Sequence, residues 1–128
     1  MEVKLLNDNL WYPTDKIFIN GQWKDCNSKK RLPIENPSNG EVIAEISDSC
    51  EIDIDEAVNS ASKALDNSWG DLTASERGRL LLKLSELVRN RIDNLAIIES
   101  IDVGKPLKQA KSDALALARY FEFYGGAS

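Results

Sequence analysis

The chain changes its sequence pattern near residue 50, and this change limits the folds that it can adopt. Before that point, short apolar runs are separated by turn-forming residues such as Asn20-Gly21. After it, apolar residues recur every three or four positions, the spacing that lines one face of a helix. The pattern therefore predicts an α/β arrangement in which a short β-hairpin and extended strands precede three amphipathic helices.

One hairpin is predicted close to the start of the chain. Residues 1–16 show no clear periodicity, and we interpret them as an N-terminal arm. The Asn20-Gly21 pair that follows can supply the positive φ angles that a tight hairpin turn requires. Residues 17–20 and 22–26 are therefore predicted to pair.

Two further extended segments are predicted before the helices. Residues 31–40 form an extended piece followed by a turn, and residues 41–46 a short strand. Pro33 cannot donate a backbone hydrogen bond, so its segment is not expected to lie in the centre of a sheet.

The first helix is identified by apolar spacing alone, and we expect it to begin near Cys50. Its predicted apolar face consists of Ile54, Ala57, Val58, Ala61, Ala64 and Leu65. The spacing therefore predicts an amphipathic helix.

The second helix has clear signals at both ends. Thr73 and Glu76 match a capping box, in which each side chain accepts a hydrogen bond from the other residue's backbone N–H. Gly104 and Pro106 match the usual end of a helix. The predicted apolar face comprises Leu80, Leu81, Leu84, Leu87 and Val88 before a bend at Asp93-Asn94, and Leu95, Ile98 and Ile101 after it.

The third helix is predicted from residue 107 to residue 124, with Gly125-Gly126 closing it. Its apolar side comprises Leu107, Ala110, Ala114, Leu117, Phe121 and Tyr124. The aromatic cluster at 120–124 is expected to pack against a further segment, because large apolar patches usually mark contact sites.

Composition excludes several classes of function. The formal net charge is −5 and the one basic run, residues 29–31, is short, so we expect no binding to nucleic acid. The chain has no histidine, which excludes Ser-His-Asp and Cys-His nucleophiles and histidine-containing zinc sites within it. No window of 18 apolar residues and no signal-peptide pattern are found, so we expect no membrane span and a cytoplasmic location.

The two cysteines, Cys26 and Cys50, form no CxxC motif and are expected to be reduced. Cys50 lies near the predicted start of a helix, where the helix dipole favours a thiolate, but the acidic residues that follow it oppose one. Cys26 lies in a polar loop without an activating neighbour in the sequence. Neither is expected to be a reactive nucleophile.

Several stretches follow one another in the order and spacing of a known protein family. They are Phe18–Trp23, Ile34–Ile43, Trp69 with Ser75–Gly78, Glu99–Pro106 and Ala118–Gly126. The ordered set resembles the N-terminal region of the NAD(P)-dependent aldehyde dehydrogenases. The resemblance covers nearly all of the chain from Lys16 to Ser128.

The resemblance implies an α/β family fold in which residues 17–128 form an incomplete N-terminal portion of the cofactor-binding domain. The hairpin and three helices would flank a cofactor-binding sheet that is absent from this sequence. The implied parent enzyme oxidises an aldehyde to a carboxylic acid with NAD or NADP. Its catalytic cysteine and glutamate and its nucleotide-binding segment belong to later parts of the family's chains, so no catalytic or cofactor-binding residue is assigned here.

The resemblance also implies what the chain would do and bind. By itself it is expected to be inactive and to bind no cofactor tightly. Its expected partner is the remainder of the dehydrogenase polypeptide, in a parent enzyme that is a homo-oligomer.

Many members of the family hold a structural Na⁺ or K⁺ between the Asn-Pro segment and the Gly-Lys-Pro turn. The match assigns the backbone carbonyls of Ile34 and Glu35 and the carboxylate of Asp102 as ligands. A further ligand would come from a later segment, so the site is expected to be incomplete in this chain.

Two other hypotheses remain. The chain could be a stand-alone, non-enzymatic interaction or adaptor protein built from the same helical unit, with the aromatic cluster as its docking surface. Alternatively, it could be a small thiol-redox protein, which would require Cys26 or Cys50 to titrate well below an ordinary thiol.

Overall fold

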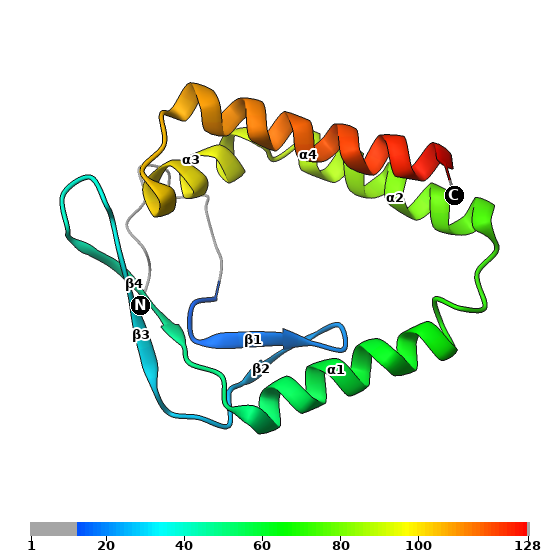
Figure 1. Ribbon diagram of the computed structural model, residues 1–128, viewed down its shortest axis with the longest axis horizontal. Helices are drawn as coiled ribbons and strands as arrows, with labels where there is room; N and C mark the ends of the chain where they lie inside the picture. The colour runs from blue at the N-terminus through cyan, green and yellow to red at the C-terminus, as the bar shows by residue number, and fades with distance from the viewer. Residues whose placement is uncertain (1–12, 128) are drawn as a thin grey trace. The chain divides into compact units, whose positions relative to one another are not determined.

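The computed structural model describes residues 13–127. The chain divides into two compact units, Met1–Asn67 and Ser68–Ser128. The described part of the first unit contains four strands and the helix α1, and that of the second contains α2, α3 and α4 (Figure 1).

The first hairpin has the predicted position and turn. Strands β1 (Lys16–Ile19) and β2 (Gln22–Asp25) pair antiparallel, with Ile19 opposite Gln22. Asn20 and Gly21 have φ angles of 52° and 74°, as a two-residue hairpin turn with two left-handed positions requires. The Lys16 and Asp25 side chains form an ion pair across the open end of the hairpin.

The two later extended segments also pair with each other. Strands β3 (Arg31–Glu35) and β4 (Val42–Ser47) form a second antiparallel hairpin with an irregularity at Ile34/Glu35. Pro33 lies in a sheet of two strands, where every strand is an edge, in agreement with the prediction. The sequence indicated both extended segments, but it did not indicate that they are partners.

Helix α1 (Glu51–Asp66) begins where it was predicted, after Cys50. Its predicted apolar face is largely exposed, and this includes Ile54, Val58 and Leu65. The helix instead buries the carboxylate of Asp53 near its start.

The second unit has three helices, so the described chain contains four helices in place of the three predicted. They are α2 (Ala74–Arg89), α3 (Ile92–Val103) and α4 (Leu107–Ala127). The predicted second helix is broken at Asn90 and Arg91, not bent at Asp93-Asn94. The Arg91 N–H bonds to the carbonyl of Val88, a tight i to i−3 turn that ends α2.

The ends of the helices confirm some sequence signals and correct another. The Thr73 N–H donates to the Glu76 carboxylate at 2.8 Å, and the Glu76 N–H donates to the Thr73 hydroxyl at 3.3 Å, which completes the capping box. Gly104 ends α3 with a φ of 73°. In contrast, α4 continues through Gly125 and Gly126, which were predicted to close it.

Small residues hold α2 against α4, which run side by side in opposite directions (Figure 1). The buried positions of the second unit are Gly78, Ser85, Val88, Ala96, Ala110, Ala114 and Ala118. All of these except Val88 are small, and small residues allow two helix backbones to approach closely. Gly125 shows how close this packing is, since a Cβ placed there would lie 3.0 Å from the carbonyl oxygen of Gly78.

Most of the leucine stripe predicted on α2 is exposed in the described structure. Leu80, Leu84 and Leu87 are 48%, 38% and 54% exposed. The sequence thus identified an amphipathic helix, but its buried positions are Gly78, Ser85 and Val88 and include no leucine. Within residues 13–127, no helix is long and apolar enough to cross a membrane.

Candidate functional site

The predicted cation ligands lie on two different units of the structure. Ile34 and Glu35 lie at the irregular end of β3, and Asp102 lies in the last turn of α3. Within the part of the chain that the structure describes, no group of three or more Cys, Asp or Glu side chains could hold a metal ion. The predicted site uses backbone carbonyls as well as a carboxylate, and it remains a prediction.

The turn between α3 and α4 is fixed by a charged network beside Asp102. The Lys105 ammonium donates to Glu99 at 2.6 Å and to Asp113 at 2.9 Å. These two bonds, first that to Glu99, raise the pKa of Lys105 above its ordinary value. The Ser100 hydroxyl also donates to the carbonyl oxygen of Lys105 at 2.8 Å, so the Gly-Lys-Pro turn is held from both sides.

A second polar cluster surrounds Asp53, whose side chain is almost completely buried at 1% exposure. Its Oδ1 accepts hydrogen bonds from the backbone N–H of Asn27 at 3.1 Å and from the side-chain amide of Asn27 at 2.7 Å. Its Oδ2 accepts from the backbone N–H of Cys50 at 3.0 Å and from the thiols of Cys26 and Cys50 at 2.9 and 3.2 Å. Every one of these contacts lies within the first unit.

The hydrogen bonds to Asp53 stabilise its ionised form. The thiol of Cys26, followed by the backbone N–H groups of Asn27 and Cys50, holds the pKa of Asp53 far below its ordinary value of 3.8. A buried carboxylate without such donors would have its pKa raised instead. The cluster therefore joins the loop after β2 to the first turn of α1 through one negative charge.

Sequence reasoning did not identify this cluster. It treated Asp53 only as a charge that opposes a thiolate at Cys50, and it found no neighbour for Cys26. One local signal was present, because an acidic residue three positions after a helix N-cap commonly bonds back to the cap's N–H. No local signal could place Cys26 and Asn27 against the same carboxylate.

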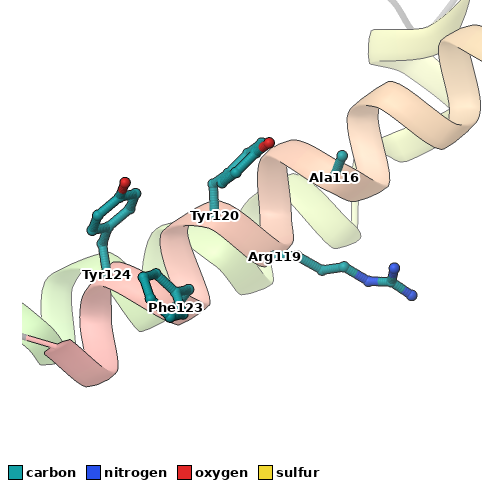
Figure 2. A pocket seen from close by; sticks show the side chains of 5 residues that line it. All are labelled: Ala116, Arg119, Tyr120, Phe123 and Tyr124. Carbon is teal, nitrogen blue, oxygen red and sulfur yellow. The ribbon is translucent and has the colours of Figure 1, made fainter.

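The aromatic end of α4 is exposed in the described structure, as the prediction of a contact surface requires. A hollow of about 470 Å³ is lined by Ala116, Arg119, Tyr120, Phe123 and Tyr124. Figure 2 shows these side chains projecting from successive turns of the one helix. The Phe123 and Tyr124 rings contact each other edge to face with their centroids 5.2 Å apart. The hollow is a surface feature of α4 and contains no cluster of catalytic groups.

Comparison with known proteins gives this fold and these motifs a family. The model of the aldehyde dehydrogenase family matches residues 23–128. The chain belongs to the aldehyde dehydrogenase family. This confirms the resemblance that the ordered motifs indicated.

Curated relatives extend well beyond the matched region. Human retinal dehydrogenase 2 is 40% identical over 121 residues, which are 92% of this chain and 23% of that protein. Betaine aldehyde dehydrogenase of Bacillus subtilis is 37% identical over 111 residues, which are 86% of this chain and 23% of that protein. The chain thus spans less than a quarter of the length of these relatives and corresponds to their N-terminal part.

Solved structures show the same fold. A Burkholderia cenocepacia protein assigned to the aldehyde dehydrogenases is 48% identical, covers 88% of this chain and 24% of its own, and has a TM-score of 0.85. Betaine aldehyde dehydrogenase of Staphylococcus aureus, solved in complex with NAD⁺, is 27% identical over 88% of this chain and 23% of its own, with a TM-score of 0.84. The fold of this chain is therefore shared with members of the family.

Proposed function

We propose that this chain is the N-terminal part of an aldehyde dehydrogenase that oxidises an aldehyde to a carboxylic acid with NAD or NADP. One observation carries the proposal: residues 23–128 match the family, while the chain spans 23% of the length of its curated relatives. The catalytic cysteine and glutamate would then come from the remainder of the polypeptide. The chain alone would have no aldehyde dehydrogenase activity.

The role of this chain within the enzyme would be structural. Exposed apolar side chains include three groups on the helices: on α1, on the leucine face of α2 and at the aromatic end of α4. Burying one large apolar side chain contributes about 1.5–3 kcal/mol, so these groups together could hold a large partner surface. We propose that later segments of the same polypeptide cover them, within a parent enzyme that is a homo-oligomer.

The cofactor of the parent enzyme is proposed to be NAD. The support is indirect, since it comes from the Staphylococcus aureus relative that was solved with NAD⁺. Saturation kinetics of the native enzyme with NAD⁺ and with NADP⁺ test the choice. A higher kcat/KM with NADP⁺ than with NAD⁺ would show that NADP is the preferred cofactor and would contradict the proposal.

The first experiment is an intact mass measurement on the protein isolated from its source, together with an assay of aldehyde-dependent cofactor reduction. We expect a mass several times 14.3 kDa and activity in that material, and none in the isolated chain. A native mass near 14.3 kDa without activity would contradict the proposal. It would favour the adaptor hypothesis, which the exposed aromatic end of α4 also supports.

The cation site is proposed for the parent enzyme. The carbonyls of Ile34 and Glu35 and the carboxylate of Asp102 would bind Na⁺ or K⁺, because hard monovalent cations take oxygen ligands. We expect K⁺ or Na⁺ to raise the Tm of the native enzyme and the variant Asp102→Asn to weaken this dependence. The matched control is Asp113→Asn, which removes a carboxylate bonded to Lys105. Equal cation dependence in all three proteins would exclude the site.

A further inference from the structure

Two cysteines that are far apart in the sequence point their thiols at the same oxygen atom. Cys26 follows β2, and Cys50 is the N-cap residue of α1. Their Sγ atoms lie 2.9 and 3.2 Å from Oδ2 of Asp53. Because both distances share this one oxygen, their sum limits the separation of the two sulfur atoms to 6.1 Å at most.

Both thiols are free and reachable. Each cysteine is partly exposed and neither is in a disulfide. A disulfide needs its sulfur atoms about 2.05 Å apart, so the pair must close a short remaining gap by rotation of the side chains. The rotation breaks the two thiol hydrogen bonds to Asp53 and the contact of Cys26 Sγ with the carbonyl oxygen of Asp48 at 3.5 Å.

The neighbouring carboxylate tolerates the loss of these bonds. Asp53 keeps the N–H of Cys50 on Oδ2 and the two donors of Asn27 on Oδ1. A buried carboxylate that retains three donors, two of them backbone N–H groups, is still well satisfied. The cluster therefore holds the thiols near each other without depending on either one.

We propose that Cys26 and Cys50 are a redox modification site, at which a reversible intramolecular disulfide links the loop after β2 to the start of α1. The proposal is independent of the dehydrogenase assignment. It differs from the expectation drawn from the sequence, in which neither cysteine had a partner.

A small-molecule disulfide, such as oxidised glutathione, is the proposed oxidant. One protein thiol loses its proton, attacks a sulfur of that disulfide and forms a mixed disulfide, and the first small thiolate leaves and takes up the proton. The second protein thiol, after losing its proton, attacks the bound protein sulfur and releases the second small thiol. The protein loses two protons and two electrons in total, and the oxidant takes them up to become two thiols.

The test is equilibration of the full chain with oxidised and reduced glutathione, followed by acid quench and intact mass. The same buffers with guanidinium chloride give the unfolded control, in which two cysteines of one chain have an effective concentration of about millimolar. We expect the native chain to lose about 2 Da as both thiols disappear, with an effective concentration at least about tenfold above that of the unfolded chain.

Peptide mapping locates the bond. Trypsin cleavage at lysine and arginine should give residues 25–29 joined to residues 32–63, and the pair should separate on reduction. The variants Cys26→Ser and Cys50→Ser should each stop at a single glutathione adduct. A native chain that accumulates two glutathione adducts, forms bonds between chains, or closes no more readily than the unfolded chain would overturn the proposal.

Discussion

Different interactions stabilise the interior of each of the two units of this chain. The interior of the first unit contains a carboxylate, Asp53, which is the largest fully buried side chain in the described structure. The interior of the second unit contains closely packed small residues such as Ala114 and Ala118, with Gly125 against the backbone of α2. The first depends on keeping a charge and its donors together, and the second depends on keeping side chains small.

This difference predicts different weaknesses. A charged group with a depressed pKa makes stability depend on pH. Close packing of small side chains makes stability depend on side-chain volume, because an added methyl group would overlap with neighbouring atoms. Hydrogen exchange resolved by peptide can follow residues 13–67 and 68–127 separately, so each variant can be assigned to its unit.

The largest effect is expected from Asp53→Ala. The substitution leaves the two donors of Asn27 and the N–H of Cys50 without their acceptor in a buried place. We expect exchange protection to disappear across residues 13–67 and to remain across 68–127. The matched control is Asp55→Ala, at an exposed position two residues further along α1, which should leave both units protected.

Acid should weaken the first unit more than the second. The pKa of Asp53 in the folded chain is lower than its ordinary value of 3.8, so its contribution to stability is complete above that value. The contribution is lost progressively as the pH falls below 3.8 toward the lower folded pKa. We expect urea midpoints measured downward from pH 6 to fall in the first unit. An equal fall of the urea midpoint in both units would contradict the conclusion that Asp53 makes the first unit sensitive to acid.

Overpacking should damage the second unit selectively. Ala118 is fully buried between α4 and its neighbours, and Ala118→Leu should cost about 1–3 kcal/mol of unfolding free energy. The control is the neighbouring Leu117→Ala, at an exposed position, with an expected cost of about 1 kcal/mol or less. If Ala118→Leu is tolerated as well as the control, the helices do not pack as described.

Two adjacent glycines should respond to the same change with opposite signs. In Gly125→Ala, the new Cβ would lie 3.0 Å from the carbonyl oxygen of Gly78 and 3.1 Å from Cγ of Leu82, so we expect a loss of about 1–2 kcal/mol. In Gly126→Ala, the Cβ meets nothing within 4 Å, and the better helix propensity should contribute up to about 1 kcal/mol. Thermal unfolding measures the stability change of each variant. Changes of the same sign in the two variants would contradict the close approach of Gly125 to the backbone of Gly78.

The smallest effect is expected on the leucine face of α2. Leu87→Gln should change the stability of the isolated chain by about 0.5 kcal/mol or less, because this side chain is 54% exposed. The neighbouring Val88→Thr places a hydroxyl in a buried position and should cost about 1–3 kcal/mol. In the native enzyme, Leu87 is proposed to be covered. There we expect Leu87→Gln to cost more stability than Val88→Thr.

The local elements of this chain could be predicted because their causes are local. Asn20-Gly21 requires a tight turn, Thr73 and Glu76 satisfy each other's backbone groups, and Gly104 adopts the left-handed conformation that ends α3. Each of these depends on residues within a few positions. The family resemblance likewise depended on the order and spacing of short motifs.

Two of the errors arose where a residue's role depends on a distant partner. Gly125-Gly126 matches the usual end of a helix, yet α4 continues because the first glycine fits against α2. The leucines of α2 match a buried face, yet Leu80 and Leu87 are exposed while Gly78 and Ser85 are buried. Hydrophobic periodicity shows that a helix has an apolar side, but it does not show which part of that side meets a neighbour.

The sequence by itself determined the two hairpin regions and the helical region, their order, several helix ends and the family, because these depend on backbone preferences and on spacing along the chain. Only the tertiary structure decided that Asp53 is buried under donors from Cys26, Asn27 and Cys50, and that small residues join α2 to α4. Apart from the bond between Cys50 and Asp53, both results depend on contacts between residues more than twenty positions apart. Such contacts are selected by shape and by hydrogen-bond satisfaction in three dimensions, which one-dimensional patterns do not record.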